Sequence, residues 1–136
     1  MNFLKKGIKV AICILLIAGT AACKKTAGEG GNSSIRGNVF TENWNGTFTI
    51  KNSEYPSADV EVYIIYGDNV SYSERIRTNY NGEYEFKYLR RGKYKIYVYS
   101  KDKTLQSKSG IVAVIKDVEI TKKKETVVVD QITIYD

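Results

Sequence analysis

Alternating apolar and polar side chains constrain the fold of this chain more than any other sequence feature. Residues 83–99 read EYEFKYLRRGKYKIYVY, in which every second side chain is apolar on either side of a central RRG. A period of two is that of a β-strand, which turns successive side chains to opposite faces. The segment therefore predicts strands at 83–88 and 94–99, joined by a turn at 89–92.

The same alternation recurs through the rest of the chain, and no segment has helical spacing. The turns at 67–69, 79–82 and 122–124 are rich in Gly, Asn or Lys and separate the strands. Strands with one apolar face each, joined by short turns, can bury those faces by packing two sheets together. We therefore expect an all-β, antiparallel, seven-stranded sandwich. Its other five strands are predicted at 35–40, 59–66, 72–78, 111–120 and 126–134, and an extra short strand is considered at 47–50 in the insertion of residues 41–55.

The order of turn and core residues resembles that of a known group of domains. Residues 78–96 follow the pattern T-x-x-x-G-x-Y-x-F-x-x-L-x-x-G-x-Y-x-I, with Gly82 and Gly92 at the turns. The segments IRGNV at 35–39 and YPSADVEV at 55–62 resemble the first strand and the proline-led second strand of the same group. The group is the carboxypeptidase regulatory-like and Cna B-type domains, which have a prealbumin-like (transthyretin-like) sandwich.

This resemblance implies an architecture of the immunoglobulin-like or prealbumin-like kind and does not specify an activity. Members of the group serve as stalks, spacers, adhesin modules and appendages of enzymes. Both the resemblance and the alternation place five side chains in the core: Tyr84, Phe86, Leu89, Tyr94 and Ile96.

The first 22 residues have the three-part layout of a secretory signal peptide. Three lysines lie within residues 5–9, an apolar run covers 10–18, and small residues fill 19–22. The apolar run is about half of the roughly 20 residues that a membrane-spanning helix needs. We therefore expect residues 1–22 to be a signal peptide that is cleaved after export.

Cys23 follows this segment in a context that resembles a bacterial lipobox. Ala21 and Ala22 supply the small residues that such a motif requires before its cysteine, whereas Thr20 stands where an aliphatic residue is usual. The resemblance implies that the Cys23 thiol carries acyl chains such as palmitate and becomes the first residue of the processed chain. Ordinary signal cleavage near Ala22, without lipidation, is the alternative.

A lipidated Cys23 would hold the protein on a membrane, since several acyl chains give stable anchoring. Lys24 and Lys25 suit acidic head groups, and no Asp follows the cysteine as an inner-membrane retention signal. We therefore expect a lipoprotein of the cell envelope on the outer membrane, with its periplasmic or surface face left open. The Gly- and Ser-rich residues up to 34 predict a flexible tether over 23–34, and the domain is expected at 35–136.

Several chemistries are disfavoured by what the sequence lacks. The chain has no His, and its two cysteines, Cys13 and Cys23, both precede the expected domain. The commonest general base, the commonest zinc ligand and a disulfide framework are therefore missing. Residues 33–136 carry sixteen Lys and Arg against fourteen Asp and Glu, which argues against nucleic acid. We expect no catalytic residue, no metal site and no cofactor.

Four aromatic side chains fall on the phase opposite to the core: Trp44, Tyr63, Tyr97 and Tyr99. Exposed aromatic rings can stack on sugars, cover a neighbouring element, close a sheet edge or form a partner interface. We therefore expect a non-enzymatic, membrane-tethered module that binds or scaffolds an envelope protein or glycan. The alternative is a carbohydrate-binding surface lipoprotein that uses these aromatic residues.

Overall fold

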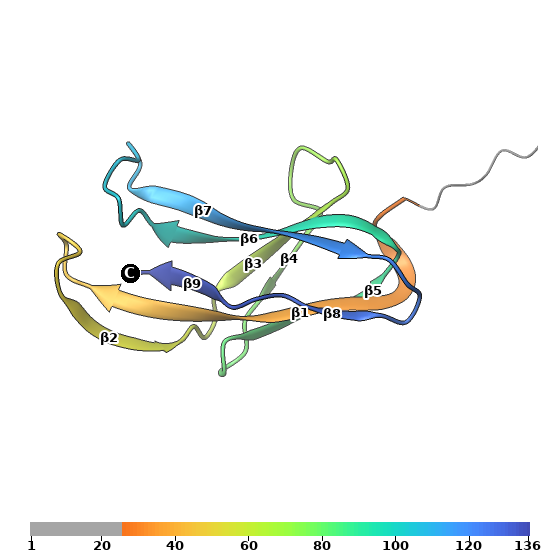
Figure 1. The fold of residues 1–136 in the computed structure, drawn as a ribbon, viewed down its shortest axis with the longest axis horizontal. Coiled ribbons are helices and arrows are strands. Elements are labelled where there is room, and N and C mark those ends of the chain that lie inside the picture. Colours follow the sequence, from red (N-terminus) through yellow and green to blue (C-terminus); the bar gives the residue numbers. More distant parts are fainter. Residues whose placement is uncertain (1–25) are drawn as a thin grey trace, which may run out of the picture.

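The computed structural model describes residues 26–136, which form nine strands arranged in two sheets (Figure 1). The predicted signal peptide and Cys23 lie outside these residues. No helix within 26–136 is long and apolar enough to cross a membrane. The strands are β1 (Glu29–Trp44), β2 (Lys51–Pro56), β3 (Glu61–Tyr66), β4 (Glu74–Arg77), β5 (Glu83–Leu89), β6 (Gly92–Lys101), β7 (Ile111–Ile120), β8 (Thr126–Val128) and β9 (Ile132–Tyr135).

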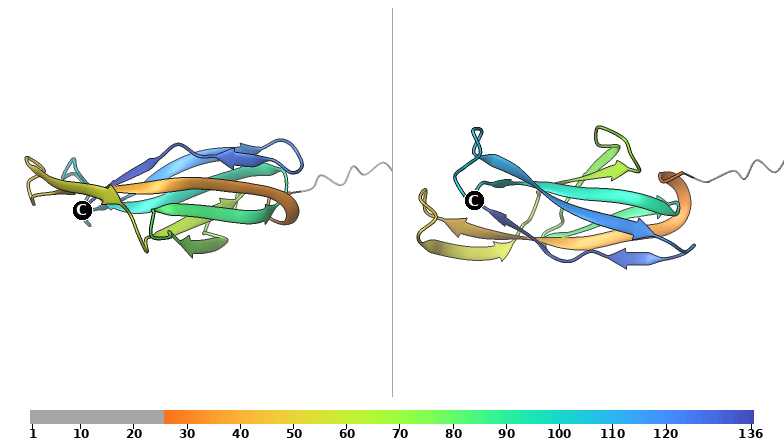
Figure 2. Two further views of the ribbon diagram at one scale, coloured as in Figure 1. Left: turned by 90° about the horizontal axis from the view of Figure 1, so that it is seen from below. Right: turned by 45° about the horizontal axis from the view of Figure 1, so that its top comes forward.

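The long strand β1 is the centre of the first sheet. It pairs antiparallel with β5 along its first part and with β2 along its second part. It also pairs parallel with β8 and β9. The segment 126–134, predicted as a single strand, is therefore two short strands, and the sheets are dominated by antiparallel pairs without being wholly antiparallel (Figure 2).

The second sheet has the strand order β4-β3-β6-β7 and is antiparallel throughout. Its register pairs Tyr63 of β3 with Tyr97 of β6, and Tyr97 in turn with Ile115 of β7. Side chains that pair in register stand on the same face of a sheet. This register therefore fixes which residues meet on the outer face.

The core lies between the two sheets and confirms the predicted sandwich. All five side chains expected in it are at most 4% exposed. Burial of a large apolar side chain contributes about 1.5–3 kcal/mol, so the alternating strands account for most of the driving force for folding. The other buried apolar residues are Ile35, Val39, Val62, Ile64, Val98, Val118, Ile120, Val129, Ile132 and Ile134.

The start of β1 lies earlier than predicted, because the strand begins at Glu29 rather than at Ile35. Ser33 is only 2% exposed, and the Gly28 N–H donates to the Tyr94 hydroxyl oxygen at 2.9 Å. A Cβ at Gly31 would overlap the carbonyl oxygen of Leu89. The glycines interpreted as a flexible tether thus allow close backbone contact with β5, so the prediction of a tether up to residue 34 was wrong.

The insertion also differs from its prediction. Residues 47–50 form no strand, because Asn45 folds the chain into a turn there: its side-chain Oδ1 accepts the N–H groups of Thr49 and Ile50. The extra strand of this region is β2, which follows the turn and pairs with the end of β1. The insertion is therefore a hairpin that extends the first sheet.

Candidate interaction surface

Four tyrosines gather on the outer face of the second sheet and form what we call the tyrosine face: Tyr63, Tyr72, Tyr97 and Tyr99. Tyr63 and Tyr97 are register partners, and their rings stack at 4.8 Å between centroids with planes 7° apart. Tyr72 and Tyr99 meet the Tyr63 ring edge-on at 5.1 and 5.5 Å. Offset and edge-on contacts of this kind are the geometries that aromatic pairs favour.

Charged groups hold one side of the tyrosine face. The Tyr63 hydroxyl donates to Glu61 Oε2 at 2.7 Å, and Arg75 and Arg77 each lie 3.6 Å from Glu61 Oε1. The hydrogen bond from Tyr63 holds the pKa of Glu61 below its ordinary value, and the same bond raises the pKa of Tyr63. Near neutral pH this rim therefore pairs a protonated phenol with an ionised carboxylate and two guanidinium groups.

The surface remains open to solvent. Tyr72 is 45% exposed and Tyr99 51%, while Tyr63 and Tyr97 are half-buried beneath them. Ile115, the register partner of Tyr97, continues the apolar surface onto β7 and is 55% exposed. A contiguous apolar strip thus runs across three strands, and exposed apolar patches on a folded domain commonly mark interaction sites.

A groove adjoins the tyrosine face at the side where the two sheets part. It has a volume of about 410 Å³, and its lining includes Tyr99 and Ile111 from the second sheet and Tyr55 and Ile134 from the first. Tyr99 belongs to both features. The tyrosine face and the groove therefore form one surface that combines aromatic rings with a concave apolar edge.

The structure brings together three of the four predicted patch residues and separates the fourth. Trp44 lies at the end of β1 in the other sheet, where its Nε1 donates to Glu42 Oε2 at 3.0 Å. The ammonium of Lys103 lies 3.9 Å from the centroid of the Trp44 ring. Among the described residues Trp44 makes no ring contact with the tyrosine face. The four residues therefore do not form a single patch.

Tyr72 is the member of the surface that sequence reasoning missed. It was predicted as the first residue of the strand at 72–78, but that strand, β4, begins at Glu74, so Tyr72 lies in the connection from β3. Its place close to the turn at 67–69 left the direction of its ring undetermined. The only available signal was its position at the start of a predicted strand.

The described residues provide little that points to catalysis. Within 26–136 no three acidic, His or Cys side chains gather as a possible metal site. The paired carboxylates Glu83 with Glu85 and Asp117 with Glu119 point outward and are exposed. These pairs are solvated charges on strand faces.

No family model matches the sequence, and no curated protein matches it significantly. A solved structure from Pseudomonas aeruginosa, of a protein proposed to bind carbohydrate, is 13% identical with a TM-score of 0.46, covering 76% of this chain and 91% of that protein. The minor pilin of Streptococcus agalactiae is 14% identical with a TM-score of 0.37, covering 75% of this chain and 45% of the pilin. Because both scores are below 0.5, these similarities carry no argument about function.

Proposed function

We propose that this chain is a non-enzymatic interaction module of the bacterial cell envelope, held at a membrane by acyl chains on Cys23, and that it docks an envelope protein on the tyrosine face. The observation that carries the proposal is the packed group of four tyrosines, two of them half-exposed, on a strand face that alternation would otherwise make polar. Tyrosine is enriched among the residues that dominate binding energy at interfaces.

The geometry of the tyrosine face supports this role. Stacking against Tyr97 restrains the ring of Tyr63, so this side chain would lose little conformational freedom when a partner binds it. Glu61, Arg75 and Arg77 provide a polar rim beside the apolar rings. An apolar centre with a polar rim is the usual anatomy of a protein interface.

Carbohydrate binding is the second candidate, and the two half-exposed rings of Tyr72 and Tyr99 are the observation that favours it. A sugar ring can pack on an aromatic ring while its hydroxyl groups bond to polar side chains nearby. Trp44 would take no part in such a site, because it belongs to the other sheet. The two candidates therefore predict the same contact residues and different captured molecules.

The test is an in-cell crosslinking pull-down of the anchored protein, with the captured molecules identified by mass spectrometry. Tyr72→Ser/Tyr99→Ser is expected to lose a defined protein partner that the wild type recovers. Tyr80→Ser/Tyr88→Ser is the matched control, because those tyrosines are 90% and 72% exposed and lie outside the tyrosine face. Recovery of glycan instead of protein would select the second candidate. Equal recovery by both double variants would refute the docking surface.

A further inference from the structure

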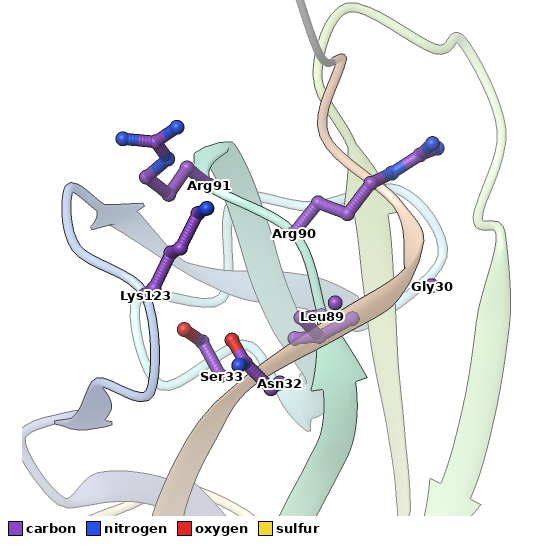
Figure 3. Close-up of a pocket in the computed structure, with 8 residues that line it drawn as sticks. Gly30, Asn32, Ser33, Leu89, Arg90, Arg91 and Lys123 are labelled. Atoms are coloured by element: carbon purple, nitrogen blue, oxygen red, sulfur yellow. The ribbon is translucent and has the colours of Figure 1, made fainter.

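The end of the sandwich where the chain enters the domain is strongly basic. It has a hollow of about 450 Å³ whose lining includes Arg90 and Arg91 from the β5–β6 turn and Lys123 from the β7–β8 turn (Figure 3). Arg91 and Lys123 extend on the same side of this hollow in Figure 3. We call the cations of the two turns the basic end: Arg90, Arg91, Lys122, Lys123 and Lys124.

Few acidic groups neutralise the basic end. Lys93 and Glu119 are cross-strand partners and balance each other. Within the two turns, residues 90–91 and 121–125, the five cations stand against one carboxylate, that of Glu125, which accepts the N–H groups of two residues of its own turn. Glu29 and Glu74, which both lie within hydrogen-bond distance of the Tyr66 hydroxyl, are carboxylates of neighbouring strands. The two turns therefore carry a formal charge of +4, whereas residues 26–136 as a whole carry sixteen Lys and Arg against fifteen Asp and Glu.

Most cations of the basic end are accessible. Arg91, Lys122, Lys123 and Lys124 are exposed, and Arg90 is partly buried. Exposed guanidinium and ammonium groups form charge-assisted hydrogen bonds with phosphate oxygens. The basic end therefore suits a ligand that carries phosphate oxygens.

The entry of the chain is fixed beside the same two turns. The Arg90 N–H donates to the carbonyl oxygen of Gly28 at 2.8 Å, and Ala27 packs directly against Gly92. Cys23 precedes Ala27 by four residues, and four residues span at most about 14 Å when fully extended. An anchor at Cys23 would therefore keep the basic end close to the membrane surface.

We infer that the basic end rests on the anionic phospholipid head groups of the membrane that holds the anchor, so that the sandwich stands end-on. The inference extends the proposed lipid anchor. The strands run along the long axis away from this end, and the β6–β7 loop lies at the opposite end (Figure 1). An end-on orientation leaves the tyrosine face accessible beside the membrane rather than pressed against it.

Vesicle co-sedimentation tests this contact without the acyl chains. The processed chain from residue 23, carrying Cys23→Ser, is mixed with phosphatidylcholine vesicles that contain either no anionic lipid or about 30% phosphatidylglycerol. Binding is expected only with the anionic vesicles, and it should fall at least about tenfold when NaCl is raised to about 0.5 M, because salt screens surface charge. Equal binding to both vesicle types, or none to either, would overturn the inference.

Charge reversal locates the contact. Arg91→Glu/Lys123→Glu is expected to weaken binding to anionic vesicles at least about tenfold, since each cation near such a surface contributes substantially. Lys103→Glu/Lys108→Glu makes the same change of net charge in the loop at the opposite end and is expected to bind like the wild type. Equal losses from both variants would overturn the inference. Acylation of Cys23 is read separately, from the mass of the processed protein in cells, so failure of the anchor and failure of this contact are distinguishable.

Discussion

The two sheets of this domain have similar inner faces and different outer faces. On the first sheet, the outer side of β5 carries Glu83, Glu85 and Lys87, all exposed to solvent. On the second sheet, the corresponding side carries the tyrosine face, with rings stacked across β3 and β6. Alternation alone would produce the first kind of outer face. The difference is why we propose the outer face of the second sheet as the docking surface, and the predictions below test this contrast.

The largest expected effect is on the free energy of unfolding, from truncation of side chains on the buried inner faces of the two sheets. Phe86→Ala removes a core ring of the first sheet, and Ile96→Ala a core side chain of the second; these residues are 1% and 0% exposed. We expect the free energy of unfolding to fall by about 3–5 and 2–5 kcal/mol, because each truncation leaves a cavity. Urea unfolding measures both values. A cost below about 1 kcal/mol in either variant would show that the inner faces are not equivalent.

The next prediction tests whether the start of β1 belongs to the first sheet. Gly31→Ala is expected to lower the free energy of unfolding by about 1–3 kcal/mol, because its Cβ would overlap the backbone of Leu89. Gly46→Ala is the matched control, since a Cβ there meets nothing within 4 Å. Thermal unfolding of both variants provides the comparison. Equal midpoints would mean that residues before Ile35 do behave as a tether.

A smaller effect is expected at the rim of the tyrosine face, and it depends on pH. The pKa of Glu61 is held below its ordinary value, chiefly by the hydrogen bond from Tyr63. A carboxylate with a lowered folded-state pKa adds stability above its unfolded pKa, and this contribution disappears as pH falls through the folded pKa.

Tyr63→Phe should therefore lose less stability than the wild type between about pH 6 and about pH 3. Thermal midpoints measured across that range provide the test. Tyr80→Phe is the control, because Tyr80 is 90% exposed and lies away from Glu61, and it should follow the wild type. A Tyr63→Phe profile parallel to that of the wild type would rule out the coupling.

The smallest effect compares a phenol inside the sandwich with those on the tyrosine face. Tyr84 is 4% exposed, and its hydroxyl has no hydrogen-bond partner among the described residues, whereas that of Tyr63 is bonded to Glu61. Burial raises the pKa of Tyr84 well above its ordinary value. Tyr84→Phe should leave the free energy of unfolding unchanged or raise it by up to about 1 kcal/mol, because no bond is lost. A loss of more than about 1 kcal/mol would reveal a hidden partner.

The inner faces could be predicted from the sequence because burial imposes a period of two. Phe86 and Ile96 were placed correctly for that reason. Gly31 was predicted to belong to a flexible tether, whereas it lies in β1 against the backbone of Leu89. Glycine is common both in flexible linkers and where two backbones approach closely, and composition does not distinguish the two. The parallel pairing of β8 and β9 with β1 depends on contacts between distant segments, which local alternation does not encode.

The candidate site was only partly predictable for a related reason. Tyr63, Tyr97 and Tyr99 share the outward phase of two recognisable strands, so their direction followed from alternation. The contact between Tyr63 and Tyr97 depends on the register between β3 and β6, which could not be predicted from the sequence. Trp44 has the same apparent phase and lies in the other sheet, because phase does not reveal which sheet a strand joins.

Site-specific photocrosslinking in cells tests the central claim most directly. A photoreactive phenylalanine analogue placed at Tyr72 or Tyr99 samples the tyrosine face, and one at Glu85 or Lys87 samples the outer face of the first sheet; all four positions are exposed. We predict a defined crosslinked protein from the first pair and none from the second pair. Crosslinks that are equally frequent from both faces, or that arise only from the first sheet, would contradict the assignment of the tyrosine face as the docking surface.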